Sequence, residues 1–315
     1  MTPQAAGPRP VTQVAVGVLV RDDGAVLLAD RPAGKPYAGY WEFPGGKIEG
    51  GESIAQALAR ELAEELGVAV QESLPWVTMD YDYPHAYVRL HFRRIYAWTG
   101  APRPVEGQRL QFLSPGKEPP APLLPAAVPA MRWIQLPTVT GCSQQTATRA
   151  EEAVQWLENV LGRGLRQVIW HEPRLDDAQR MVALAACGRL AAAYGARLLV
   201  DVRSLPVDGG MPPDLTGRLL DVAALRTGSH RRTGGWLGTM VETAADLASA
   251  AALGCDFAIL DAARVRPGTP QWGPLAELCG MAPLPLYLAG ELDLAYLVAT
   301  QAVGAHGLVT RPSLA

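Results

Sequence analysis

Residues 46–68, GKIEGGESIAQALARELAEELGV, carry the strongest structural signal in the chain. Ser53 and Gln56 have the spacing of a capping box, which marks the start of a helix. Gly67 follows the last apolar position of the pattern, as a helix-terminating glycine does. The pattern therefore predicts a helix over about residues 53–66, preceded by a glycine-rich loop.

Three carboxylates of this helix are predicted to share one face. Glu61, Glu64 and Glu65 are spaced i, i+3 and i+4, while leucines form a neighbouring stripe that can face a core. Carboxylates so close repel one another by about 0.2–0.5 kcal/mol per pair when exposed, and by more when buried, unless a cation neutralises them. Oxygen ligands of this kind favour Mg²⁺ or Mn²⁺. Taken alone, three glutamates at this spacing more often form a solvated acidic face.

The whole stretch is more specific than its glutamates. It matches G-x5-E-x7-R-E-U-x-E-E-x-G-U at every fixed position, and in this it resembles the Nudix box. The resemblance is closest to the MutT type, the oxidised-purine nucleotide diphosphatases, and covers about residues 11–136. Outside the box it rests on Val14–Val20, Arg31, Trp41–Gly46 and Glu106. It implies an α/β/α sandwich with a mixed sheet.

The resemblance also implies a chemistry, the cleavage of a nucleoside triphosphate to a monophosphate and pyrophosphate in nucleotide-pool sanitation. It implies Mg²⁺, with Mn²⁺ as an alternative, held by Glu61, Glu64, Glu65 and Glu106. Glu61 would also take a proton from the attacking water. Arg60 would orient the glutamates and Glu52 would support the metal indirectly.

Substrate binding is where the sequence departs from the MutT pattern. The expected substrate-binding residues are Arg31, Phe43, Gly45, Gly46 and Ala127. MutT-type enzymes place an asparagine in a P-A-N-E-P-like segment to read the oxidised purine, and Ala127 occupies that position here. Alanine cannot hydrogen-bond a base edge, so we do not expect a strict preference for 8-oxo-guanine.

The second part of the chain has a different sequence pattern. A proline-rich stretch ends near Pro129, so we predict a Nudix domain over residues 1–129 and a second domain over residues 130–315. Short apolar runs then alternate with helix-like segments, which predicts a TIM-like parallel barrel and an α/β class for the chain. The eight candidate strands are Trp133–Leu136, Gln167–His171, Arg197–Val202, Leu219–Leu225, Gly235–Gly238, Phe257–Leu260, Leu284–Leu288 and Gly307–Thr310.

This half resembles thiamine-phosphate synthase, particularly its TenI-like relatives. The resemblance rests on Trp236–Leu247, Ala251–Leu260, Pro283–Gly290 and Gly304–Gly307. The catalytic and phosphate-binding residues of the synthase are not matched. Ile169–Pro173 lacks the Arg and Lys of its pyrophosphate motif. Met240 and Glu242 replace a Ser and a His, and Glu291 replaces a glycine of its phosphate loop. We therefore expect a barrel that binds a ligand, regulates or mediates assembly, with His171 and Glu172 at the C-terminal mouth.

Composition excludes several classes of function. The 315 residues carry a net charge of −3 and no long basic run, which argues against binding to nucleic acid polymers or acidic membranes. The four cysteines form no C-x-x-C pair, which argues against zinc. No signal peptide or run of about 20 apolar residues is evident, so we expect a cytoplasmic protein acting on a small nucleotide, with a homodimer left open. Two alternatives remain: hydrolysis of a thiamine-type diphosphate, and a sensor that binds a nucleotide or thiamine-like ligand.

Overall fold

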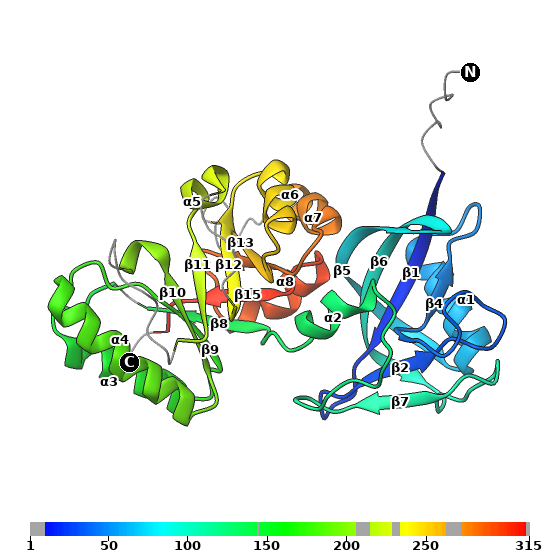
Figure 1. The fold of residues 1–315 in the computed structure, drawn as a ribbon, viewed down its shortest axis with the longest axis horizontal. Helices are drawn as coiled ribbons and strands as arrows, with labels where there is room; N and C mark the ends of the chain where they lie inside the picture. The colour runs from blue at the N-terminus through cyan, green and yellow to red at the C-terminus, as the bar shows by residue number, and fades with distance from the viewer. Residues whose placement is uncertain (1–9, 144, 206–214, 229–233, 263–271, 313–315) are drawn as a thin grey trace, which may run out of the picture. The chain divides into compact units, whose positions relative to one another are not determined.

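The computed structural model describes residues 10–143, 145–205, 215–228, 234–262 and 272–312 (Figure 1). These residues form two compact units. The first contains the described chain up to Leu136 together with Cys279–Pro283, and the second contains residues 137–278 and 284–315. The boundary predicted at Pro129 falls inside a short helix, α2 (Ala127–Trp133).

The first unit is built on two sheets, one of which is mixed. In the four-stranded sheet, with the order β4-β1-β6-β5, β1 pairs in parallel with β6 and antiparallel with β4. The other sheet has the order β3-β2-β7 and is antiparallel. The strands are β1 (Val11–Leu19), β2 (Val26–Asp30), β3 (Trp41–Glu42), β4 (Gly45–Lys47), β5 (Ala69–Tyr83), β6 (Ala86–Thr99) and β7 (Leu110–Leu113).

Helix α1 (Ile54–Leu66) confirms the helix predicted from residues 53–66. The Ser53 side chain accepts a hydrogen bond from the Gln56 backbone, and the Gln56 side chain accepts one from the Ser53 backbone. Gly67 ends the helix in the left-handed conformation, with φ 67°. Leu58, Leu62 and Leu66 are fully buried in the core of this unit, so the opposite face of α1 is left to present its glutamates.

The second unit contains the predicted closed barrel of eight parallel strands. The strand order is β10-β11-β12-β13-β14-β15-β8-β9, and β9 pairs with β10 to close it. The strands are β8 (Val139–Cys142), β9 (Gln167–Trp170), β10 (Arg197–Asp201), β11 (Gly217–Leu220), β12 (Trp236–Val241), β13 (Phe257–Asp261), β14 (Leu286–Ala289) and β15 (Gly307–Thr310). The accompanying helices are α3 (Ala150–Gly162), α4 (Asp177–Ala193), α5 (Val222–Thr227), α6 (Ala244–Ala252), α7 (Trp272–Met281) and α8 (Leu297–Ala302), with short 3-10 turns at Val202–Ser204 and Leu294–Tyr296.

One predicted barrel strand was wrong, and another was wrong in part. The run Trp133–Leu136 is not the first strand, because Trp133 ends α2 and its ring packs edge-on against Trp76 at 6.2 Å. A short apolar run does not by itself distinguish a strand from a buried helix end. The run Leu219–Leu225 is divided at Asp221, whose side chain caps α5 by accepting a hydrogen bond from the Ala224 backbone.

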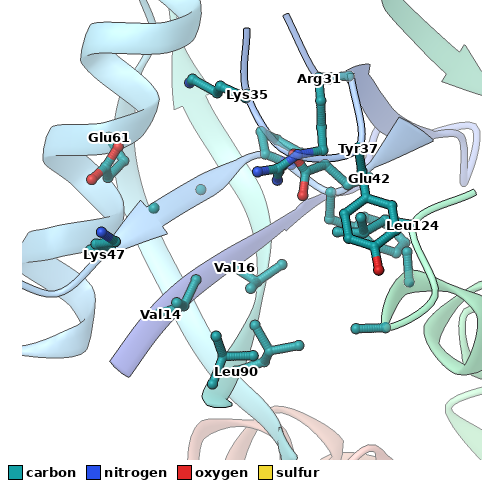
Figure 2. Close-up of a pocket in the computed structure, with 18 of the residues that line it drawn as sticks. Val14, Val16, Arg31, Lys35, Tyr37, Glu42, Lys47, Glu61, Leu90 and Leu124 are labelled. Carbon is teal, nitrogen blue, oxygen red and sulfur yellow. Dashed lines mark hydrogen bonds and ion pairs between the residues drawn. The ribbon is translucent and has the colours of Figure 1, made fainter. Parts of the chain in front are cut away.

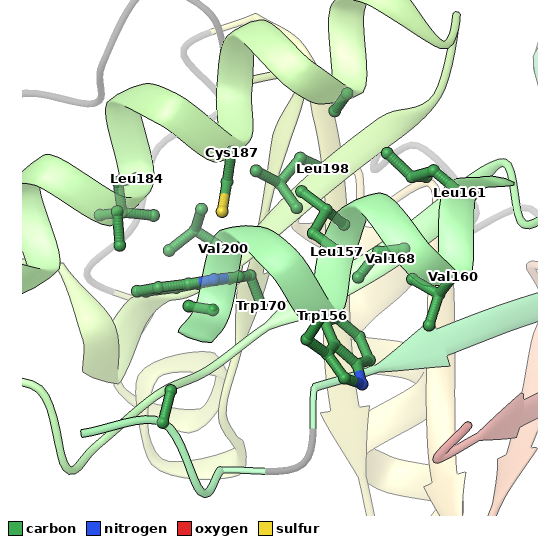
Figure 3. Packing of buried hydrophobic residues seen from close by; sticks show 14 of the residues in the cluster. Trp156, Leu157, Val160, Leu161, Val168, Trp170, Leu184, Cys187, Leu198 and Val200 are labelled. Atoms are coloured by element: carbon green, nitrogen blue, oxygen red, sulfur yellow. The ribbon is translucent and has the colours of Figure 1, made fainter. Parts of the chain in front are cut away.

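Helices α3 and α4 cover the strands β9 and β10 (Figure 3). Leu157 and Val160 from α3 and Leu184 from α4 are buried in this layer. They pack with Trp170 and Val200 from the two strands. The barrel is therefore closed off by an apolar layer on this side. None of the helices in the described part of the chain combines the length and the apolar character that crossing a membrane requires.

Candidate active site

A pocket of about 800 Å³ lies within the first unit, and its two ends differ in chemistry (Figure 2). At one end are charged side chains from α1, β4 and nearby loops. At the other end the walls are aromatic and aliphatic. The charged lining includes Lys35, Lys47, Glu49, Glu61, Glu65 and Glu106, and the other end includes Tyr37, Tyr83, His85, Leu124, Ala126 and Ala127.

Arg60 connects the glutamates of the Nudix-like segment. Its Nε and Nη2 donate to the two carboxylate oxygens of Glu52 at 2.7 and 2.9 Å. Its Nη1 donates to Glu61 at 3.0 Å and to Glu64 at 3.4 Å. The hydrogen bonds from Arg60 lower the pKa of Glu52 to about 2, so Glu52 stays ionised beside Arg60. The bidentate contact fixes the guanidinium, and the guanidinium in turn positions Glu61.

Two glycines allow the β4 backbone to approach its neighbours. Gly45 has φ 146°, and a Cβ at this position would lie 2.2 Å from the carbonyl oxygen of Ala15. A Cβ at Gly46 would lie 2.1 Å from the carboxylate carbon of Glu61. Glycine at 46 therefore leaves the space that the Glu61 carboxylate occupies.

Glu65 lies in a crowded acidic environment. Its side chain is mostly buried, and burial is the main reason why its pKa is raised to about 7. Glu106, Glu61 and Glu42 raise that pKa further by repulsion, whereas Lys35 lowers it. The Lys35 ammonium is 2.7 Å from Glu106 and 3.9 Å from Glu65. Lys35 thus partly neutralises the two carboxylates that come from α1 and from the loop before β7.

Arg31 and Glu42 form an ion pair midway along the pocket. Arg31 Nη1 is 2.6 Å from Glu42 Oε1, and Arg31 Nε donates to the carbonyl of Pro36 at 2.7 Å. Burial raises the pKa of Glu42, and its contact with Arg31 acts in the opposite direction. Figure 2 places this pair between Glu61 and Tyr37.

The donor set suits a hard divalent cation. Glu61, Glu65 and Glu106 all line the same pocket and offer only carboxylate oxygens there. Burial, and then the charges of Glu106 and Glu61, raise the pKa of Glu65, and a divalent cation would offset both effects. Among the described residues, no three His, Cys, Asp or Glu side chains are grouped closely enough to form a metal site, and Lys35 contacts Glu106 while Arg60 contacts Glu61.

The remaining predicted residues are distributed unevenly around the pocket. Arg31, Phe43, Gly45, Gly46 and Ala127 all line it. Phe43 also packs edge-on against Phe92 at 6.2 Å, so its ring has a structural contact as well. Glu52, Arg60 and Glu64 are not among the lining residues, and the side chain of Glu64 is 62% exposed.

Sequence reasoning missed Lys35, Tyr37 and Glu42. Lys35 and Tyr37 lie in the loop between β2 and β3, and loops on a rigid scaffold commonly carry functional residues. Glu42 stands next to the glycine-rich segment within Trp41–Gly46, which was the available signal. None of the three belongs to a periodic pattern, so their convergence on the pocket required the fold.

The two residues expected at the barrel mouth are held by bonds within the barrel. His171 Nδ1 is 2.6 Å from Ser204 Oγ, and its backbone N–H donates to Ser143 Oγ at 2.9 Å. Glu172 is buried and accepts a hydrogen bond from the Ala147 backbone at 3.1 Å. Both side chains therefore connect the ends of β8, β9 and β10.

The chain is similar in sequence to several known proteins. The NUDIX domain model matches residues 11–157. The chain is 36% identical over 102 residues to the 8-oxo-dGTP diphosphatase of Escherichia coli (strain K12), covering 32% of this chain and 79% of the relative. It is 37% identical over 116 residues to the CTP pyrophosphohydrolase of the same organism, covering 37% of this chain and 86% of the relative.

A solved structure titled thiamine phosphate pyrophosphorylase, from Pyrococcus furiosus, is also similar. It shares 14% sequence identity, with a TM-score of 0.44, over 55% of this chain and 85% of that chain. A similarity of this size carries no functional implication for the barrel, whose architecture follows from its own strand pairing.

Proposed function

Because this chain belongs to the Nudix family of hydrolases, which act on phosphoric anhydride bonds, we propose that its first unit is a divalent-cation-dependent nucleoside triphosphate pyrophosphohydrolase. The preferred cation is Mg²⁺, and the products are a nucleoside monophosphate and pyrophosphate. The observation that carries the proposal is the convergence of Glu61, Glu65 and Glu106 at one end of a pocket whose other end is aromatic.

The charged end suits the polyphosphate of such a substrate. Lys35 and Lys47 line it together with the carboxylates, so anionic oxygens can be bound directly or through cations. A bound divalent cation would neutralise phosphate charge and acidify a water molecule. Glu61, held by Arg60 at 3.0 Å and seated against Gly46, is placed to accept a proton from that water.

The aromatic end suits a nucleobase. The E. coli relatives are named for 8-oxo-dGTP and CTP, a purine and a pyrimidine. Ala127 lines this end and supplies no hydrogen-bonding side chain. We therefore propose activity on several nucleoside triphosphates rather than strict selection of 8-oxo-guanine, and a role in nucleotide-pool sanitation.

The test is pyrophosphate release from 8-oxo-dGTP, dGTP and CTP, and phosphate release from thiamine diphosphate, with Mg²⁺, with Mn²⁺ and with a chelator. Glu61→Gln and Glu64→Gln should each lower kcat by about 10²–10⁴-fold because a carboxylate needed for cation binding or proton transfer is lost. Glu72→Gln, an exposed change on β5, is the matched control and should leave kcat unchanged.

The chelator should abolish turnover and added Mg²⁺ should restore it. The proposal is wrong if no nucleotide is hydrolysed, or if Glu61→Gln keeps full activity. Faster phosphate release from thiamine diphosphate than pyrophosphate release from every nucleotide would contradict the substrate assignment.

A further inference from the structure

The aromatic end of the pocket is an organised cluster of rings. The ring of Tyr37 lies 5.2 Å from that of Tyr40, at an interplanar angle of 77°, and 5.6 Å from that of Tyr83. The His85 ring is 5.8 Å from Tyr37 and 5.4 Å from Tyr83. Tyr37, Tyr83 and His85 line the pocket, whereas Tyr40 supports Tyr37 from outside the lining.

Tyr37 is held in an uncommon backbone conformation. Its φ is 61°, in the left-handed region that bulky residues rarely adopt. Such a conformation persists only where surrounding contacts enforce it, and it is found at functional sites. Here the carbonyl of Tyr37 accepts from the Tyr40 backbone at 3.0 Å, and the carbonyl of Pro36 accepts from Arg31 at 2.7 Å. Pro36, the residue before Tyr37, is thus held by the same arginine that pairs with Glu42.

The facing side chains are small and apolar. Tyr37 and Leu124 both line the pocket, and Figure 2 places them at the opposite end from Glu61. Ala126 and Ala127 also line this end. The backbone N–H of Ala127 is already bonded to the carbonyl of Leu124 at 2.8 Å, so neither it nor the methyl group is placed to read a base edge. What this end offers is a flat aromatic surface facing aliphatic groups.

We propose that Tyr37 is the nucleobase platform of this enzyme, stacking on the face of the base while Tyr83 and His85 brace its ring. The inference rests on the proposed function and adds to it how the substrate is chosen. Every base has a π-face, so recognition by stacking tolerates purines and pyrimidines alike. Tyr37 is accordingly a substrate-binding residue that acts on the affinity for any nucleobase and leaves the hydrolytic step alone.

The experiment compares Tyr37→Phe, Tyr37→Leu and Tyr37→Ala in the full chain, using dGTP and dCTP as substrates. Stacking on one aromatic ring contributes enough binding that its loss should raise KM for both nucleotides by about tenfold or more in the Leu and Ala variants. Tyr37→Phe, which keeps the ring, should remain within about threefold of the wild type. The kcat values should change little, because the carboxylates are at the other end of the pocket.

Inorganic tripolyphosphate, which has no base, separates stacking from a general effect on the pocket. Its inhibition constant against dGTP hydrolysis should be the same in the wild type and in Tyr37→Ala. Tyr96→Ala is the matched control, since this tyrosine on β6 is 44% exposed and does not line the pocket; it should leave KM unchanged.

The outcomes separate this inference from the proposed function. If the wild type hydrolyses nucleotides but Tyr37→Ala and Tyr37→Leu have the wild-type KM, the assignment of Tyr37 as the platform is wrong and the proposed function stands. The platform is also wrong if tripolyphosphate inhibition weakens in parallel with nucleotide binding. If the wild type hydrolyses no nucleotide, the proposed function fails first.

Discussion

The position of the Glu61 carboxylate depends on a residue that has no side chain. Gly46 lies on β4, and the space its Cβ would occupy is filled by the Glu61 carboxylate. Arg60 holds the same carboxylate from the other side, at 3.0 Å. Glu61 is therefore confined between a strand backbone and a guanidinium, which is the kind of confinement that a positioned acid–base group requires.

Gly46→Ala should disrupt this arrangement without unfolding the unit. The added methyl group would push aside the end of a flexible side chain rather than backbone, so we expect kcat to fall at least tenfold with a stability change below about 1 kcal/mol. Gly50→Ala is the matched control, because nothing lies within 4 Å of its Cβ. Steady-state pyrophosphate release and thermal unfolding provide the two measurements. Normal activity in Gly46→Ala would contradict the proposed constraint on Glu61.

At the scale of elements, α1, α4, α5 and α6 each begin with a side-chain cap. Helix α6 begins with a capping box in which Asp246 accepts from the Thr243 backbone at 3.0 Å. Arg226 from α5 adds a contact at 2.8 Å to the same carboxylate. Chiefly because of Arg226, the pKa of Asp246 is lowered to about 2. Asp246 thus joins two helices as well as capping one of them.

Asp246→Asn should destabilise the barrel by about 1–3 kcal/mol at pH 7, because a buried charged acceptor is lost. A lowered folded-state pKa means that this stabilisation is complete above the ordinary value of 3.8 and is lost as the pH falls toward about 2. Urea denaturation should therefore show a constant difference in the free energy of unfolding between wild type and variant from pH 7 to 5. Below pH 4 this difference should become smaller.

Glu242→Gln is the control for this pair. Glu242 contacts the same arginine at 3.0 Å, but its side chain is 64% exposed. An exposed ion pair contributes little, so the change should cost less than about 0.5 kcal/mol. Equal effects of the two substitutions would argue against a special role for Asp246.

At the scale of the whole molecule, each compact unit has its own core. All residues that line the pocket belong to the first unit. The layer of α3 and α4 over β9 and β10 belongs to the second (Figure 3). Damage to one core should therefore be separable from the chemistry of the other unit.

Leu157→Ala tests this separation. Leu157 is fully buried in the second unit, so its truncation should lower the free energy of unfolding by about 2–5 kcal/mol. At 25 °C the folded variant should keep the wild-type kcat and KM for dGTP. Val298→Ala is the control, because Val298 is 77% exposed, and it should change stability by less than about 0.5 kcal/mol. A large loss of activity in Leu157→Ala would show that the site depends on the barrel core.

Local and periodic features of the chain were predictable. The caps of α1, its buried leucine stripe and most of the barrel strands follow from side-chain chemistry and hydrophobic pattern. The helix that ends at Trp133 was not predictable from local features, because Trp133 packs against Trp76, a residue far away in the chain. Glu61, Glu64 and Glu65 were predictable as one face, but only Glu61 and Glu65 line the pocket.

The sequence by itself determined the order of charged and apolar groups along α1, the family to which the chain belongs and the alternation of strands and helices in the barrel. Only the tertiary structure decided that Lys35 reaches Glu106, that the space at Gly46 receives Glu61, and that Tyr37 joins Tyr83 and His85 at the far end of the pocket. The physical reason is that these contacts join loops and strands distant in the chain. Neither helical nor strand periodicity encodes which such residues meet.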